Sequence, residues 1–154
     1  MRAVMSERGE APEDDAGERD EAPDDSGERD RSPQAPGEHV YDLFRRGSAL
    51  LESGDFAAAT IPLEQARSLE PEKASIREAL GRAYFQSGRY GAARDEFAAV
   101  VERSPVNDFA HFCLARALEK TGDRVRARRH FALAACLRPD RADYRAYHDR
   151  SSAA

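Results

Sequence analysis

The sequence predicts an all-α protein, a right-handed α-solenoid of three antiparallel helix pairs followed by a short capping helix. Pro71, Pro105 and Pro139 recur at intervals of 34 residues, and Gly54 and its equivalents keep the same interval. Small and bulky apolar positions hold this register from residue 40 to residue 141. A repeat of this length, built from one supersecondary unit, is typical of a stacked helical array.

The composition excludes a membrane-spanning protein and a disulfide-rich one. The chain has 154 residues, of which 40% are hydrophobic and 34% charged, and no apolar run approaches the ~18 residues of a spanning helix. The first residues contain no apolar segment of a secretory signal. Cys113 and Cys136 alone cannot form a disulfide framework, which favours a reducing compartment. We therefore expect a cytoplasmic protein with no membrane partner.

Residues 1–39 differ in composition from the rest of the chain. They contain thirteen acidic residues against five arginines, a net charge of −8, and the segment DDAGERD at 14–20 returns as DDSGERD at 24–30. Such a segment cannot bury enough apolar surface to offset the entropy of ordering. We predict a disordered acidic arm. It serves either as a solubilising tail or as a weak, salt-dependent competitor for the net +4 of residues 108–154.

The repeat divides the remaining chain into three units of two helices each. Glycine ends each first helix, where a left-handed residue is needed, and proline ends each second helix. Pro62 falls within the second helix of the first unit and should kink that helix or delay its start. The predicted units are 40–73, 74–107 and 108–141, with helices at 40–53, 57–69, 74–87, 91–103, 108–121 and 125–137. Tyr144 and Tyr147 indicate a capping helix over 142–150, before a frayed tail at 151–154.

Two columns of the repeat explain how the helices pack. Small residues allow two helix backbones to approach closely, and large apolar residues fill the space beside that contact. The small column is Gly47, Gly81 and Ala115, and the large column is Leu63, Phe97 and Phe131.

The middle unit resembles the tetratricopeptide repeat (TPR) family. It carries Leu80-Gly81-x₂-Tyr84, then Ala93-x₃-Phe97 and Pro105, in the spacing of that family's motif. The resemblance covers residues 40–141 and implies a non-catalytic protein-binding module. As a whole the chain resembles the small repeat proteins common in actinobacteria, which share no single function. The motif's first position, often Trp, departs from the family pattern: it is Leu43, Arg77 and His111 here.

The first helices of such an array line its concave side, and one face of each should form a binding strip. Aromatic side chains that no core column explains gather on this face beside two arginines. We expect this strip to bind a protein or peptide partner that has apolar anchors and an acidic group. The alternative is that the chain's own tail or a second copy fills the strip, making the protein a homodimer or assembly subunit. The candidate residues are Tyr41, Phe44, Ser48, Leu51, Arg82, Phe85, Phe109, Phe112 and Arg116.

Some members of the family hold a C-terminal carboxylate in a basic and amide clamp on these faces. The resemblance implies Lys and Asn at two clamp positions of the first unit, which are Phe44 and Ser48 here. The later clamp positions hold Ala79, Phe109 and Cys113. We therefore expect no recognition of chaperone C-termini.

Other chemistry finds little support in the sequence. There is no phosphate-binding loop, nucleophile elbow or metalloprotease motif, so we expect neither an enzyme nor a cofactor. His111 and Cys113 are two residues apart on one helix and Cys136 is six beyond His130, which argues against a zinc site. The arginines at 124, 126, 128 and 129 are interpreted as a solvated helix face rather than a nucleic-acid surface.

Overall fold

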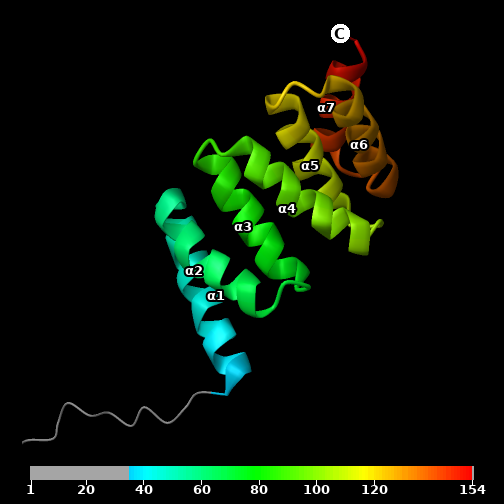
Figure 1. The fold of residues 1–154 in the computed structure, drawn as a ribbon. Helices are drawn as coiled ribbons and strands as arrows, with labels where there is room; N and C mark the ends of the chain where they lie inside the picture. Colours follow the sequence, from blue (N-terminus) through cyan, green and yellow to red (C-terminus); the bar gives the residue numbers. More distant parts are fainter. Residues whose placement is uncertain (1–34, 154) are drawn as a thin grey trace, which may run out of the picture. The chain divides into compact units, whose positions relative to one another are not determined.

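The computed structural model describes residues 35–153, which form seven α-helices (Figure 1). They are α1 Pro36–Ser53, α2 Phe56–Leu69, α3 Ala74–Gln86, α4 Tyr90–Arg103, α5 Asp108–Lys120, α6 Arg124–Leu137 and α7 Ala142–Ser152. No strand occurs within this range. Most of the predicted arm, residues 1–34, lies outside the described residues, and its disorder stays a prediction. Within 35–153 no helix is both long and apolar enough to cross a membrane.

The start of the first helix corrects the predicted boundary at residue 40. Helix α1 begins at Pro36, so residues 36–39 belong to the helix and not to the arm. Proline suits the first turn because its ring presets the helical φ and its missing N–H has no partner there. Glu38 in the same turn adds a favourable interaction with the helix dipole. The other predicted helix ends agree with the structure to within two residues.

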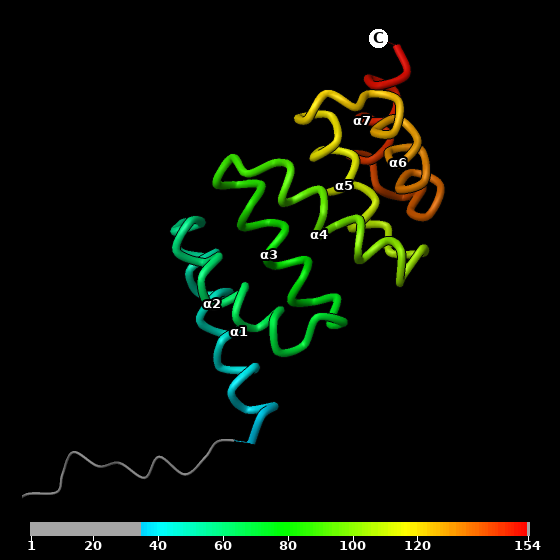
Figure 2. Tube along the Cα trace, viewed as in Figure 1, coloured from blue at the N-terminus to red at the C-terminus, as the bar shows by residue number. Residues whose placement is uncertain are grey.

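The helices stack as successive antiparallel pairs, α1–α2, α3–α4 and α5–α6, followed by α7 (Figure 2). Within two residues after the end of each first helix stands a glycine with a positive φ, which is 86° at Gly54, 84° at Gly88 and 93° at Gly122. This left-handed conformation favours glycine and reverses the chain into the second helix. The architecture is the expected all-α solenoid of helix pairs.

The core follows the two packing columns. Leu63, Phe97 and Phe131 are each at most 1% exposed. Opposite Phe97 lies Gly81, where an added Cβ atom would stand 2.8 Å from the ring carbons. That contact is too short for any side chain, so glycine is required for α3 and α4 to approach this closely.

Helix α2 continues through Pro62 without a break. The helix begins at Phe56, so the expectation of a delayed start is wrong. Proline removes one backbone hydrogen bond, the one to the carbonyl of Ala58 four residues earlier. Ala58 is exposed, so water can satisfy that carbonyl, while Pro62 itself is buried.

One side of α1 is polar, although the equivalent side of α3 is apolar and buried. Three positions that are buried in the second unit carry charged side chains in the first. The charged set is Asp42, Arg45 and Arg46, and its equivalents one unit later are Ile76, Ala79 and Leu80. This side is therefore suited to solvent rather than to another helix pair. At the other end α7 packs on α6 and buries Tyr144, which is 1% exposed.

Candidate functional site

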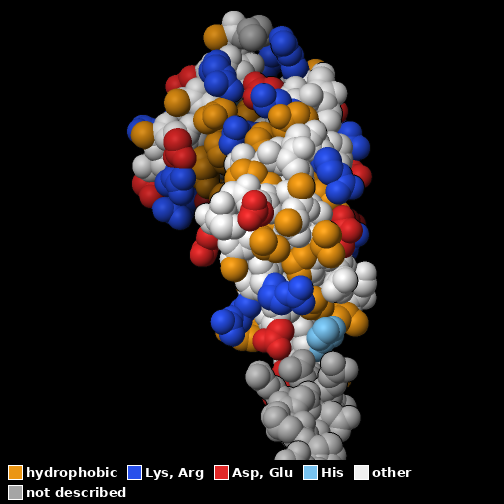
Figure 3. All heavy atoms as spheres, turned by 90° about the vertical axis from the view of Figure 1, so that its left-hand side faces the viewer, with side chains coloured by type: hydrophobic (Ala, Val, Ile, Leu, Met, Phe, Trp, Pro, Cys, Tyr) orange, Lys and Arg blue, Asp and Glu red, His pale blue; other side chains and the backbone are white. Residues whose placement is uncertain are grey.

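Two adjoining hollows lie along the first helices of the pairs, and together we call them the groove. The first, between α3 and α5, has a volume of about 170 Å³, and the second, between α1 and α3, about 300 Å³. Arg82 and Phe109 line both hollows, which makes them continuous. In the space-filling view, a recess on one face shows hydrophobic side chains bordered by charged ones (Figure 3). Such a surface is typical of a protein-binding site.

The hollow between α3 and α5 is lined mainly by phenylalanine rings. Phe109 is 38% exposed and meets Phe97 edge to face, with ring centroids 6.5 Å apart. Phe85 meets Tyr90 in the same manner at 5.1 Å. Rings held in this way offer rigid apolar contact area at a low entropic cost to a ligand side chain.

Two arginines border this hollow. The guanidinium carbon of Arg116 lies 4.7 Å from the ring centroid of Phe85 and 5.7 Å from that of Tyr147. These cation–π contacts hold the Arg116 guanidinium in place. Arg82 is exposed. Neither arginine forms an ion pair with any residue in 35–153, so both charges remain available at the groove.

The hollow between α1 and α3 carries negative charge instead. Glu52 and Glu78 line it together with Phe44. Glu78 accepts a hydrogen bond of 2.6 Å from Nδ2 of Asn107, whose Oδ1 accepts the backbone N–H of Ala110 and so caps α5. The groove is therefore acidic toward the first unit and basic toward the third.

The capping helix covers the third-unit end of the aromatic strip. Phe112 stacks on Tyr144 at 4.7 Å and meets Tyr147 edge to face at 5.0 Å. Arg150 lies 3.4 Å from a carboxylate oxygen of Glu119. The capping helix thus covers the far end of the strip and leaves the hollow between α3 and α5 open.

The structure brings eight of the nine candidate residues to the groove. The eight are Phe44, Ser48, Leu51, Arg82, Phe85, Phe109, Phe112 and Arg116. Tyr41 lies outside both hollows, 61% exposed, with its ring 5.9 Å from the guanidinium carbon of Arg45. Leu51 is only 8% exposed and belongs mainly to the core. Tyr41 therefore lines neither hollow of the groove.

Seven groove residues were not among the nine candidates: Glu52, Ser75, Glu78, Ala79, Gln86, Phe97 and Cys113. Glu52 and Gln86 directly follow the candidates Leu51 and Phe85, so a wider face on each helix would have included them. Burial raises the pKa of the Cys113 thiol to about 12, so this thiol stays protonated at neutral pH. It contributes apolar surface to the groove rather than a nucleophile.

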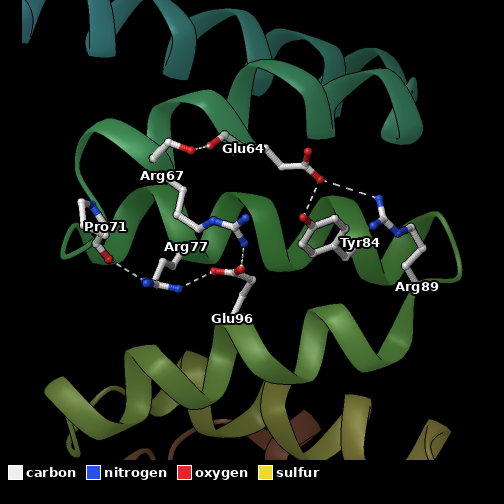
Figure 4. A network of polar contacts seen from close by, with 8 residues as sticks. Glu64, Arg67, Pro71, Arg77, Tyr84, Arg89 and Glu96 are labelled. Carbon is white, nitrogen blue, oxygen red and sulfur yellow. Dashed lines mark hydrogen bonds and ion pairs between the residues drawn. The ribbon is translucent and has the colours of Figure 1, made fainter.

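A polar cluster links α2, α3 and α4 (Figure 4), and none of its labelled residues lines the groove. The carboxylate of Glu96, whose side chain is 5% exposed, pairs with Arg67 and with Arg77, the latter at 2.9 Å. Arg77 also donates from Nε to the carbonyl of Pro71 at 2.6 Å. The arginine at the motif's first position thus ties one unit to the turn before it, and we assign this cluster to stability.

The equivalent positions of the third unit hold two histidines. Nδ1 of His111 lies 3.0 Å from Nδ1 of His130, and Nε2 of His111 lies 2.7 Å from the carbonyl of Pro105. Because a carbonyl only accepts, His111 carries its hydrogen on Nε2 and accepts the Nδ1–H of His130. Burial first, and then His111, lower the pKa of His130. The sequence did not predict that His111 and His130 would contact each other.

Residues 35–153 contain no cluster of three or more potential metal ligands. Arg124, Arg126 and Arg129 are exposed on α6, and Arg126 lies 3.6 Å from Asp123. Arg128 donates from Nε to the carbonyl of Ser151 at 3.0 Å and so helps to fix α7. These contacts agree with a solvated helix face.

Comparison with known proteins identifies the repeat. The model of the tetratricopeptide repeat family matches residues 44–108 and 79–146, which together cover more than half of the chain. A comparison with curated proteins finds no match.

Solved structures show the same fold. One is the first TPR domain of Spaghetti (RPAP3) bound to the HSP90 peptide SRMEEVD, at 14% identity and a TM-score of 0.70, over 75% of this chain and 91% of that one. A MamA structure, designated MSR-1 C2, has 28% identity and a TM-score of 0.67, over 73% and 64%. The type III secretion chaperone SycD of Yersinia enterocolitica, with a peptide of the translocator YopD, has 17% identity and a TM-score of 0.64, over 75% and 88%. This chain thus spans less than two thirds of the MamA chain.

Proposed function

Because the chain belongs to the tetratricopeptide repeat family, we propose that it is a non-catalytic module that binds a partner protein segment in its groove. The observation that carries this proposal is the open hollow between α3 and α5, lined by Phe85, Phe109 and Phe112 and bordered by Arg82 and Arg116. A hydrophobic floor with unneutralised charge at its edge supports recognition of an amphipathic segment.

Two of the similar solved structures support this function, because each contains a bound peptide. The Spaghetti domain was solved with an HSP90 peptide and SycD with a peptide of YopD, so both of those proteins bind peptides. Their identity to this chain is below 20%, so the likeness is one of fold. We propose only that the groove described above serves the same general purpose here.

Affinity capture tests the proposal with two matched variants of the full chain. Phe109→Ser removes an exposed ring from the groove, and Val125→Ser removes an apolar side chain that is 69% exposed on α6, outside both hollows. Phe112→Ser is unsuitable because Phe112 packs on the capping helix. Circular dichroism confirms that both variants fold.

A partner captured by the wild type and by Val125→Ser, but lost with Phe109→Ser, supports the proposal. A partner that both variants retain contradicts it. If the species lost with Phe109→Ser is a second copy of this chain, the groove is a self-association surface instead. Sedimentation at micromolar concentration measures that outcome directly.

A further inference from the structure

A further hollow lies among α5, α6 and α7, and we call it the arginine hollow. It has a volume of about 200 Å³ and shares no residue with the groove. Its lining consists of Glu119, Arg124, Ala127, Arg128, Arg150 and Ser151. Three arginines and one glutamate give this lining a net charge of +2. A concave surface with such a charge attracts anions.

Contacts with neighbouring groups hold two of the three arginines in position. Arg128 of α6 donates from Nε to the carbonyl of Ser151 in α7 at 3.0 Å. The guanidinium carbon of Arg150 lies 4.4 Å from the ring centroid of Tyr147, and one of its nitrogens lies 3.4 Å from a carboxylate oxygen of Glu119. Side chains that are positioned before a ligand arrives lose less entropy when it binds.

The position of Arg124 is unfavourable for the helix that carries it. Arg124 is the first residue of α6, where the positive end of the helix dipole disfavours a cation. It is also four residues from Arg128, a spacing at which like charges on a helix repel. Within residues 35–153 Arg124 forms no ion pair, because Asp123 lies beside Arg126 instead. Such local conflicts are expected at functional sites, where a ligand relieves them.

The charge and size of the arginine hollow select the chemistry of its ligand. A phosphate monoester carries about −1.5 to −2 charges at pH 7, which matches the net charge of the lining. Guanidinium groups bind pairs of phosphate oxygens through two parallel hydrogen bonds. The volume is below the roughly 300–1,000 Å³ of pockets that hold drug-sized ligands, so the hollow suits a single phosphate group. A phosphodiester has only one negative charge and is less suitable.

We propose that the arginine hollow binds the phosphate group of a phosphate monoester or inorganic phosphate. Arg124 of α6 and Arg150 of α7 pair with the phosphate oxygens, and Arg128 adds positive charge beside them. The phosphate group comes either from a free small molecule or from a phosphorylated side chain of a protein, and its chemistry is the same in both. Because the hollow shares no residue with the groove, this inference is independent of the function proposed above.

Titration of the ¹⁵N-labelled full chain tests the inference at about pH 7.5 and a constant ionic strength of about 0.15 M, kept with chloride. One probe is inorganic phosphate, and the other is the acetylated and amidated peptide Gly-phosphoserine-Gly. The controls are dimethyl phosphate, a monoanionic diester, and the unphosphorylated peptide. We expect both probes to shift amides at the start of α6 and the end of α7. Dimethyl phosphate should bind at least about threefold more weakly, and the unphosphorylated peptide should not bind.

The two probes distinguish the sources of the phosphate group. Tighter binding of the phosphopeptide than of inorganic phosphate supports a phosphorylated side chain as the ligand. Equal or weaker binding of the phosphopeptide supports a free phosphate compound.

Variants of the full chain locate the contacts. We expect Arg124→Ala and Arg150→Ala each to weaken phosphate binding about three- to tenfold, since a charge-assisted hydrogen bond is lost at an exposed site. Arg129→Ala is the matched control, because it removes an exposed charge from α6 but does not line the hollow.

The stability of Arg124→Ala separates binding from a structural role. In phosphate-free buffer this variant should be as stable as the wild type or more stable, because it removes the repulsion from Arg128. Phosphate should raise the thermal midpoint of the wild type more than that of Arg124→Ala, because it binds the folded wild type more tightly.

Three results would overturn the inference. An equal loss of affinity with Arg129→Ala, or equal affinity for dimethyl phosphate, indicates unspecific attraction to a basic surface. Absence of shifts with both probes shows that the hollow binds no phosphate. A marked destabilisation by Arg124→Ala in phosphate-free buffer shows that this arginine serves the fold.

Discussion

His111 and His130 meet across α5 and α6, with their Nδ1 atoms 3.0 Å apart and their rings stacked at 5.2 Å. The equivalent residues one unit earlier are Arg77 and Glu96, which form an ion pair at 2.9 Å. The same location between paired helices thus holds an ion pair in the second unit and two histidines in the third. This difference leads to the first two predictions.

The histidine pair predicts that stability falls as the solution becomes acidic. The pKa of His130 is lowered in the folded protein, mainly by burial and then by His111, Arg126 and Arg129. The unfolded chain therefore binds more protons than the folded one from about pH 6.5 downward, until the lowered pKa is reached. We expect the free energy of unfolding to decrease over that range in denaturant titrations. His130→Gln should reduce this slope, and an unchanged slope would exclude the histidine as its source.

The Arg–Glu pair predicts a large cost for removing its carboxylate. Glu96→Ala leaves Arg67 and Arg77 without their shared partner, and we expect a loss of about 2–4 kcal/mol in unfolding free energy. The control is Glu72→Ala, which breaks an ion pair with Arg103 between side chains about 60% exposed. That change should cost less than about 1 kcal/mol. Equal losses of unfolding free energy would show that the burial of Glu96 does not raise the cost of losing its ion pairs.

The close approach of α3 and α4 predicts that Gly81→Ala is destabilising. Its new Cβ atom would meet the ring of Phe97, so the ring must move within a packed core. We expect a loss of about 1–3 kcal/mol, measured by chemical denaturation. Gly37→Ala is the matched control, since nothing lies within 4 Å of its Cβ position in α1. That variant should be neutral or slightly stabilising because alanine favours helix.

The groove composition predicts that a terminal carboxylate adds no affinity. Phe44 and Ser48 stand where the family's clamp requires a basic and an amide side chain. We therefore expect the peptide SRMEEVD to bind no better than millimolar in calorimetry, and equally with a free or an amidated C-terminus. Micromolar affinity that amidation abolishes would show a clamp built from other residues.

The sequence predicted most of the fold because the repeat constrains it. Each unit needs a small residue where helices approach and a glycine where the chain reverses, so Gly81 and Gly88 mark their positions without any structural information. The start of α1 was misplaced because residues 36–39 lie before the first repeat unit, so the 34-residue register does not extend to them. The effect of Pro62 on the start of α2 was overestimated, because the residue that loses its hydrogen-bond donor, Ala58, is exposed to water.

The sequence indicated which helix faces line the candidate site, but not that α7 covers part of it. Helical spacing placed Phe85 and Phe109 on one face, and both line the hollow between α3 and α5. It could not show that Tyr147 of α7 would pack on Phe112 and lie beside Arg116, because that contact depends on how the last helix crosses α5. Nor could it show that Tyr41 lies beyond the groove.

Site-specific photo-crosslinking in a host lysate tests whether the groove is where a partner protein binds. A photo-reactive amino acid is placed at Phe109, within the groove, or at Val125, on the exposed face of α6. We expect a crosslink between a distinct partner protein and position 109, and none at position 125. A crosslink at position 125 alone, or equal crosslinks at both positions, would contradict the assignment of the groove as the binding site.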